Sequence, residues 1–407
     1  MLCRHCDSIL ELDLIDLGSA PLSNGYLTKE QLSQGEITYP LRVKVCESCY
    51  LVQTLDFVTS TDVFTSNYHY FSSTSTTWVS HALNFAERIT KDLGLNSNSL
   101  VIEIASNDGY LLQHFNKLGI PNFGIEPTKS TAETAREKGV KTLEEFFSLE
   151  LARNLTSQGD YADLIIGNNV YAHVPDINDF TRGMKEVLKP NGTIVLEFPH
   201  LLQMMKKNLF DTIYHEHFSY LSLNVVTNIF KAAGLKVWDV EKISTHGGSL
   251  RVYGCHLNSE ITKTNRVNDL VNDEITAGLL NPKAYAGFED ESIRIKNNLQ
   301  KLLIAKYEEG KKIVAYGAAA KGNTLLNFAG VKKDLIAYVV DASIAKQGLY
   351  LPGSHIPVYS PTKLAERDFE SILILPWNLS SEITKVIRQQ YKIDTNIFTA
   401  VPTIKFY

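Results

Sequence analysis

Side chains that can exchange protons near neutral pH are concentrated in one short segment, Asp211 to Tyr220. It contains Tyr214, His215, Glu216 and His217 in succession. Histidine titrates near neutrality and an adjacent carboxylate can raise its basicity, so the segment is suited to acid–base catalysis. Two alternatives stay open. The histidines can be a structural pair, or they can bind a metal, although no obvious third ligand accompanies them and the pattern is not H-E-x-x-H.

Four of the five cysteines form two Cys-x2-Cys pairs near the N-terminus, namely Cys3, Cys6, Cys46 and Cys49. Two such turns can present four thiolates to one tetrahedral ion, and disulfides are not expected in a chain without an export signal. We therefore predict a structural Zn²⁺ that takes no part in chemistry, because four sulfur ligands leave no open position. Cys255 is expected to be a small core residue.

A third group of residues is typical of an adenosine-binding turn. Leu100 to Phe115 reads as a buried strand, a turn at Ser106–Gly109 and a helix start. A dinucleotide turn requires G-x-G-x-x-G, whereas the segment Glu103–Gly109 has one glycine and two carboxylates, which would repel phosphate and attract the cationic S-adenosylmethionine. Glu126, at the end of the next strand, is in the position expected for a ribose-binding acid. The alternative is a structural α/β core that carries an acid by chance.

The predicted cofactor site combines this turn with the residues that follow two later strands. Its members are Glu103, Ala105, Asn107, Asp108, Gly109, Glu126, Asn168 and Asn169.

Two further turns have the composition of anion sites. Gly247 and Gly248 free the backbone shortly before Arg251, which suits a phosphate group, although a plain turn into a strand explains the residues equally well. Lys321 lies in a turn of small residues, 318–322, that precedes a predicted helix. The Walker A pattern is absent, so this second turn is not predicted to hydrolyse ATP.

Length and composition limit the classes of protein. A chain of 407 residues is expected to form two or three domains, and 44% hydrophobic with 21% charged residues is typical of a soluble globular protein. The net charge of −5 argues against a nucleic-acid partner. No apolar run approaches the roughly 20 residues that span a bilayer and no leader pattern is present, so we expect a cytoplasmic protein without a membrane partner.

These residues must be positioned by alternating strands and helices. Apolar runs at 100–104, 121–126, 162–167 and 193–198 predict a doubly wound α/β sheet, with a helix over 78–93 before it. The spacing at 265–307 predicts a connecting helix. Runs at 312–317, 335–341 and 371–376 predict a second α/β unit. Aromatic residues at 66–75, among them Tyr68, favour either a strand face or a substrate contact.

The ordered motifs resemble those of the S-adenosylmethionine-dependent sugar C-methyltransferases, which act on nucleotide-linked 4-keto-deoxysugars. The resemblance rests on the four cysteines, the 103–109 turn, Ala172-His173-Val-Pro, Tyr214-His-Glu-His217-Phe, His246-Gly-Gly-Ser-Leu-Arg251 and Tyr316-Gly-Ala-Ala-Ala-Lys-Gly322-Asn. It implies a zinc-binding domain (1–66), a class I Rossmann-like methyltransferase domain (67–243) and a Rossmann-like C-terminal domain (244–407), with the sugar nucleotide, of dTDP type, held between the lobes.

The resemblance also assigns catalytic roles. It implies active-site residues at Tyr68, His173, Tyr214, Glu216 and His217, while Tyr171 stands where a small aliphatic residue is expected and is predicted to alter the sugar pocket.

A carbon beside a ketone becomes a nucleophile only after losing a proton, so a base and a donor to the enolate oxygen are needed. We expect His217 to be the base, oriented by Glu216, with Tyr214, Tyr68 and His173 as candidate donors, and C-3 to be the methylated carbon. A nicotinamide-dependent sugar oxidoreductase and a non-catalytic sugar-nucleotide-binding protein are the competing classes. The sequence sets no oligomeric state, and a monomer is compatible with it.

Overall fold

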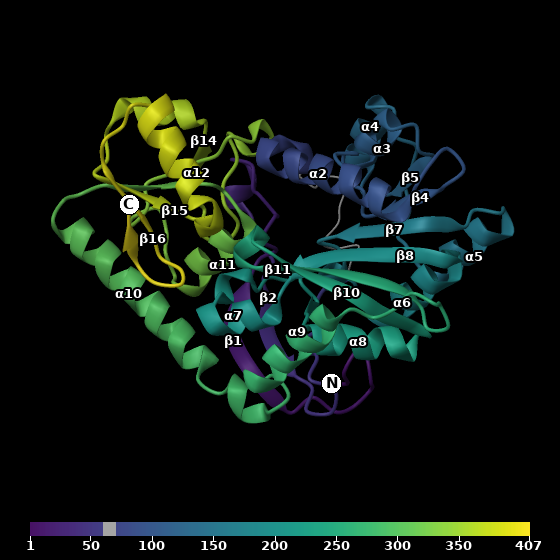
Figure 1. Ribbon diagram of the computed structural model, residues 1–407. Coiled ribbons are helices and arrows are strands. Elements are labelled where there is room, and N and C mark those ends of the chain that lie inside the picture. Colours follow the sequence, from purple (N-terminus) through teal and green to yellow (C-terminus); the bar gives the residue numbers. More distant parts are fainter. Residues whose placement is uncertain (60–70) are drawn as a thin grey trace.

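The computed structural model describes residues 1–59 and 71–407, and these form two α/β lobes with a small N-terminal sheet between them (Figure 1). The central lobe is built on a seven-stranded sheet and the C-terminal lobe on a six-stranded one. The first predicted doubly wound unit and the second α/β unit are therefore both present.

The central sheet has the order β10-β11-β8-β7-β4-β5-β6. Strands β4 to β8 pair in parallel, whereas β11 is antiparallel to both of its neighbours. The parallel strands are apolar throughout because helices cover both faces, and Leu164, Ile165 and Ile166 have no exposed surface. The strand bounds are β4 Val101–Ile104, β5 Asn122–Ile125, β6 Thr142–Leu143, β7 Ala162–Asn168, β8 Leu188–Pro199, β10 Leu235–Ile243 and β11 Ser249–His256.

Helices pack on both faces of this sheet. On one face lie α2 (Thr76–Leu93), α3 (Leu112–Lys117) and α4 (Lys129–Glu137). On the other lie α5 (Leu149–Ser157), α6 (Ile177–Val187), α8 (Leu223–Ala232) and α9 (Asn265–Thr276). Helix α2 begins where Ser75 accepts a hydrogen bond from the Trp78 amide, and it ends at Gly94, whose φ is 63°.

The central sheet extends past the domain boundary that the sequence indicates. Strand β11 starts after residue 244 but is inserted between β10 and β8, with Leu250 opposite Phe198. The boundary at 243/244 therefore cuts a continuous sheet, and the central α/β unit extends to His256. The glycine-containing turn at 244–248 is a tight connection between the adjacent antiparallel strands β10 and β11, which agrees with the plain turn into a strand that the sequence allows.

The N-terminal sheet includes a strand from the acid–base segment. Its order is β1-β2-β3-β9, all antiparallel, with bounds β1 Leu12–Ala20, β2 Tyr39–Val45, β3 Val52–Thr54 and β9 Ser219–Tyr220. Val52 pairs with Tyr220, and Gln53 with Ser219. The predicted catalytic segment is therefore anchored to the N-terminal sheet, and no sequence pattern indicated this pairing.

The C-terminal sheet has the order β14-β13-β12-β15-β16-β17, parallel except for its last pair. Its strands are β12 Ile313–Tyr316, β13 Val339–Val340, β14 Val358–Tyr359, β15 Ser371–Ile374, β16 Asn396–Thr399 and β17 Lys405–Phe406, and its helices are α10 Phe288–Glu308, α11 Ala320–Phe328 and α12 Ser380–Lys385. One face shares a core with the N-terminal sheet and α7 (Leu201–Lys207).

The predicted connecting helix at 265–307 is two helices. Helix α9 packs on the central sheet and α10 on the N-terminal and C-terminal sheets. The break contains Gly278 and Gly287, both at positive φ, and Pro282. These residues disfavour a continuous helix, although the periodic apolar positions on either side suggested one.

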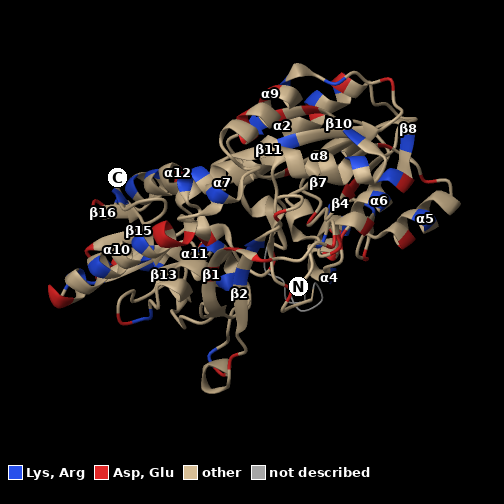
Figure 2. Ribbon diagram, turned by 90° about the horizontal axis from the view of Figure 1, so that it is seen from below, with Lys and Arg blue, Asp and Glu red and all other residues tan. Residues whose placement is uncertain are grey.

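In the view of Figure 2, the Lys and Arg residues are interspersed with Asp and Glu over the lobes. Among the described residues, none of the helices combines the length and the apolar character needed to cross a membrane.

Candidate active site

A cavity of about 470 Å³ lies where the three parts of the chain meet. The central lobe supplies most of its wall and the N-terminal part contributes Asn24. The C-terminal lobe contributes Lys321, Lys346, Pro376, Asn378 and Leu379, among others. The cavity wall contains seven predicted site residues from outside the 214–217 segment, namely Ala105, Asn107, Glu126, Asn168, Asn169, His173 and Lys321. The predicted catalytic residues Tyr214, Glu216 and His217 also line it.

Glu126 is held at the end of β5 by the turn that precedes α3. Its two carboxylate oxygens accept hydrogen bonds from the backbone amides of Asn107 and Thr128, each at 2.9 Å. Burial raises the pKa of this carboxyl, although the bonds from Thr128 and Asn107 oppose that effect. Each oxygen keeps a lone pair that can accept a further hydrogen bond, so the carboxylate fits a ribose diol.

The other two acids of the turn lie behind the cavity wall. Glu103 is fully buried, and burial together with Asp108 and Glu126 raises its pKa well above the usual range. Asp108 pairs with Lys138 at 3.0 Å and accepts a hydrogen bond from the Ser73 hydroxyl. Gly109 has a φ of 73° and packs against α4, where an added Cβ would lie 3.0 Å from Val140. These three residues shape the turn from behind.

Aromatic side chains line the cavity beside the predicted cofactor residues. Trp78, Tyr110, Phe146 and Phe147 line it, and the Tyr110 hydroxyl accepts a hydrogen bond of 3.2 Å from the Asn168 amide. Sequence reasoning missed all four. Phe146 and Phe147 lie three and four residues after the end of β6, so their position beyond a strand end is a signal that could have found them.

Three histidines stand close together in the wall. The rings of His173 and His217 are 4.7 Å apart, and the Tyr214 ring is 4.0 Å from His217. Burial lowers the pKa of His173 and of His246 to about 4, and burial together with His173 lowers that of His217 well below its usual value. These shifts favour the neutral form of all three imidazoles.

His217 and Glu216 have different partners from those the sequence suggests. His217 Nδ1 lies 2.7 Å from the Thr212 carbonyl oxygen, so that nitrogen carries the proton and Nε2 is the acceptor. Glu216 accepts a hydrogen bond from the Asn24 side-chain amide of the N-terminal part. The described contact that orients His217 is thus a backbone carbonyl, whereas Glu216 was expected to do so.

Two residues of the predicted sugar site need separate comment. Tyr68 lies outside the described residues. Tyr171 is not in the cavity wall: it is fully buried among Phe180, Phe198 and Phe230, and its hydroxyl lies 2.7 Å from the Thr181 hydroxyl. Tyr171 therefore has no described contact with the cavity, and any effect on the sugar pocket would have to be indirect.

Of the four predicted phosphate-binding residues, Lys321 lines the cavity, whereas Arg251, Gly247 and Gly248 do not. Arg251 is absent from the cavity wall, because its guanidinium is buried and pairs with Glu197 at 2.9 Å and Glu241 at 3.4 Å. An added Cβ on Gly247 would lie 2.5 Å from Trp377, so this glycine permits close packing between the lobes.

Gly248 also has a positive φ, and an added Cβ would lie 2.7 Å from Gln203. Lys321 does line the cavity and donates a hydrogen bond of 2.8 Å to Asn378.

The four N-terminal cysteines form one cluster whose Sγ atoms all lie within 4.8 Å of one another. Cys3 and Cys49 are 3.6 Å apart, and Cys6 and Cys46 are 3.5 Å apart. A tetrahedral zinc ion with Zn–S bonds of about 2.3 Å separates its ligands by roughly 3.8 Å, so the cluster fits this ion. Cys255 is buried in β11, away from the cluster.

Comparison with known proteins decides the family. Family models for a zinc binding domain, a methyltransferase domain and a C-methyltransferase C-terminal domain match residues 3–64, 77–240 and 244–402. The C-methyltransferase NovU of Streptomyces niveus is 33% identical over 381 residues, which cover 94% of this chain and 90% of NovU. This chain belongs to the C-methyltransferase family.

More distant similarities are shorter. A ubiquinone biosynthesis O-methyltransferase of a Chelativorans species is 31% identical over 96 residues, 23% of this chain and 37% of that protein. The magnesium protoporphyrin IX methyltransferase of Synechocystis with bound SAM covers 44% of this chain and 81% of its own, at 14% identity and a TM-score of 0.33, which is too low to support an inference.

The C-methyltransferase is thus an S-adenosylmethionine-dependent enzyme with a zinc-binding N-terminal domain, as the sequence predicts.

Proposed function

We propose that this C-methyltransferase methylates a carbon beside the ketone of a nucleotide-linked 4-keto-deoxysugar, C-3 of a dTDP-type sugar. The observation that carries the proposal is the neutral, buried His217, whose Nδ1–H is fixed by the Thr212 carbonyl and which lines the same cavity as the predicted cofactor residues. A carbon acid requires such a base, because the carbon attacks the methyl group only after losing a proton.

In the proposed mechanism His217 Nε2 removes the proton from the carbon next to the ketone. Burial keeps the imidazole neutral and thus able to accept this proton. Tyr214 and His173 adjoin His217 and are suited to donate a hydrogen bond to the enolate oxygen. Tyr68 is a further candidate donor on the resemblance in sequence alone. Glu216, held by Asn24, is suited to bind a sugar hydroxyl or to support the protonated base.

At the other end of the cavity, Glu126 would hold the ribose of S-adenosylmethionine, and Asn107, Asn168 and Asn169 would contact the rest of the cofactor. When bound, the sulfonium supplies the methyl group that the enolate attacks. The chain's task is then to hold donor and acceptor in line at near-contact distance.

The sugar nucleotide would extend toward the C-terminal lobe. Lys321 and Lys346 are the cations of that wall and can attract a diphosphate. Asp211 is close to Lys321 and accepts a hydrogen bond of 2.6 Å from the Trp377 indole, and burial raises its pKa to about 6.

Deuterium exchange tests the proposal directly. With S-adenosylhomocysteine in place of the methyl donor and a dTDP-4-keto-deoxysugar in D2O, we expect the wild-type enzyme to exchange the hydrogen at the methylation site without forming product. The His217→Asn variant should not exchange. If the wild-type enzyme binds S-adenosylmethionine but catalyses no deuterium exchange in any 4-keto sugar nucleotide, this substrate class is ruled out. If the His217→Asn variant catalyses exchange at the wild-type rate, the base is another residue.

A competing activity has no support from the cavity. A nicotinamide-dependent oxidoreductase needs a glycine-rich turn for its pyrophosphate, whereas the turn here places Asn107 and the Glu126 carboxylate at that point. Calorimetric titration with NAD and with S-adenosylmethionine separates the two, and we expect binding of the latter only.

A further inference from the structure

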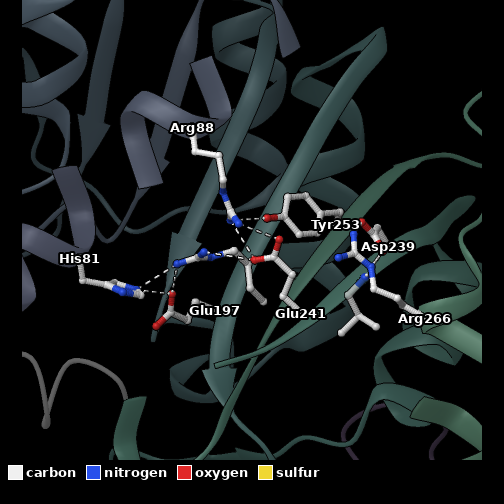
Figure 3. Close-up of polar contacts among 9 residues, drawn as sticks. His81, Arg88, Glu197, Asp239, Glu241, Tyr253 and Arg266 are labelled. Atoms are coloured by element: carbon white, nitrogen blue, oxygen red, sulfur yellow. Dashed lines mark hydrogen bonds and ion pairs between the residues drawn. The ribbon is translucent and has the colours of Figure 1, made fainter. Parts of the chain in front are cut away.

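We propose that Glu197 is a positioning residue that holds the cofactor wall of the cavity in place. Glu197 lies near the end of β8, has no exposed surface and is not itself part of the wall. Its side chain lies among charged and polar residues from α2, β10 and β11 (Figure 3). Three separate contacts connect this one residue to three side chains that do line the cavity.

The first contact runs through α2. Glu197 Oε2 lies 3.0 Å from His81 Nε2, and the His81 ring stacks on Trp78 with a centroid distance of 4.9 Å and an interplanar angle of 18°. Trp78 lies one turn before His81 on the same helix, so the two rings overlap along one face. Fixing His81 therefore limits the positions that the Trp78 indole can take in the wall.

The second contact runs through the turn between β10 and β11. Glu197 Oε1 accepts a hydrogen bond of 3.1 Å from the Thr245 hydroxyl. The next residue, His246, lines the cavity and has a φ of 53°, in the left-handed region that a residue with a side chain rarely adopts. A conformation of this kind persists only when neighbouring contacts fix it, and Glu197 supplies one of them.

The third contact is made by the backbone. The Asn169 amide donates a hydrogen bond of 2.7 Å to the Glu197 carbonyl oxygen, while the Asn169 side chain lies 3.4 Å from His246. Asn169 also has a positive φ, of 52°.

These contacts join into a ring around the cofactor side of the cavity. Trp78 stacks on Tyr110 at 6.0 Å and meets His246 edge-on at 5.7 Å. Tyr110 accepts a hydrogen bond from Asn168, and Asn169 reaches His246. Glu197 supports this ring at Trp78, His246 and Asn169. The inference rests on the proposed cofactor role of Asn168 and Asn169.

The charge of Glu197 is balanced locally. Burial alone would raise the pKa of this carboxyl, but His81 and Arg251 outweigh the burial and lower its pKa. Arg251 also pairs with Glu241, which in turn holds Arg88 on the outer side of the same network through two bonds of 2.9 Å. Glu241 therefore anchors α2 and Arg251 as Glu197 does, but its described contacts include neither His81 nor Thr245. This difference makes Glu241 a matched control.

The test compares Glu197→Gln with Glu241→Gln by calorimetric titration with S-adenosylmethionine, alongside the unfolding midpoint of each protein. We expect Glu197→Gln to raise the Kd about tenfold, as for loss of a charged hydrogen-bond acceptor, and Glu241→Gln to change it less than about twofold. Thr245→Val, which removes only the second contact, should raise the Kd about threefold. In the double variant Glu197→Gln/Thr245→Val, the Kd should rise by less than the product of the two single rises. The two effects are not independent, because both act through His246.

Two results would overturn the proposal. The first is an unchanged Kd for Glu197→Gln in a folded protein, and the second is an equal rise for Glu241→Gln, which would indicate general loss of stability. If Glu197→Gln does not fold, Thr245→Val breaks the second contact alone and His81→Leu removes the first contact together with the stack on Trp78, and wild-type affinity in both would equally refute it. Asn169→Ala is measured in parallel, since wild-type affinity in that variant would refute the cofactor assignment itself and not the role of Glu197.

Discussion

His217 Nδ1 and the carbonyl oxygen of Thr212 are 2.7 Å apart, at the end of the short helical turn Phe210–Thr212. Because a carbonyl oxygen can only accept, this contact assigns the ring proton to Nδ1 and leaves Nε2 to act as the base. The geometry makes the proposed mechanism testable with a substitution that keeps one nitrogen and removes the other.

Asparagine at position 217 can still donate to Thr212 but has no atom at the place of Nε2. We expect His217→Asn to lower turnover by roughly 10²- to 10⁴-fold, the usual contribution of a general base, with nearly unchanged affinity for S-adenosylmethionine. The neighbouring His215 contacts the carbonyls of Tyr39 and Pro40 and is outside the cavity wall, so His215→Asn is the control. Near-normal turnover in the 217 variant would exclude His217 as the base.

Glu126→Ala should weaken binding of S-adenosylmethionine by about 1 to 3 kcal/mol, since the cofactor would lose a charged hydrogen-bond acceptor at its ribose. Calorimetric titration measures this change. Glu144→Ala, which removes a half-exposed acid paired with Arg136 on the same side of the lobe, should leave the affinity unchanged. If the two variants bind alike, Glu126 does not contact the ribose.

Cys46→Ser should release the zinc ion together with the fold of the N-terminal sheet, because Cys46 is fully buried at the end of β2 and its thiolate is one of four ligands. Metal analysis should find one zinc per wild-type chain and less in the variant. Cys255→Ser changes the cysteine outside the cluster and should retain the metal. Full zinc occupancy in Cys46→Ser would disprove the four-cysteine site.

Tyr171→Phe should lower stability without changing the KM for the sugar nucleotide. The substitution removes the hydroxyl that lies 2.7 Å from Thr181, and Thr181 keeps its own bond to the Ile177 carbonyl, so the cost is about 1 kcal/mol. Urea unfolding and steady-state kinetics measure the two quantities. A changed KM with unchanged stability would show that the residue reaches the substrate after all.

The parts of the fold and site that sequence predicts well are those set by local pattern. Glu126 follows a buried strand at the carboxyl edge of a parallel sheet, where ligand-binding residues gather, and the structure has it in the cavity wall. The strands around Asn107 and Asn168 are apolar runs between turns, so their ends could be placed within a residue or two. The roles of these residues remain predictions.

Sequence pattern does not predict the role of a residue when that role is set by partners far away in the chain. Arg251 after two glycines has the composition of a phosphate site, but Glu197 and Glu241 neutralise it. Asn24 and Lys346 reach the cavity from the N-terminal and C-terminal parts, and no local pattern distinguishes them from surface residues. Tyr171 illustrates the same limit, because its orientation toward Phe180 and Phe198 follows from packing between elements.

The pairing of β9 with β3 has a consequence for building chimaeras from members of this family. The segment that carries Tyr214 and His217 continues into a strand of the N-terminal sheet, and the Thr54 hydroxyl donates to the His217 carbonyl oxygen at 2.6 Å. The N-terminal module and residues 209–222 therefore form one exchangeable unit although they are far apart in sequence. Recombination that exchanges residues 1–59 alone would combine His217 of one parent with strand β3 of the other. Crossover points should therefore be chosen so that residues 1–59 and 209–222 are transferred together.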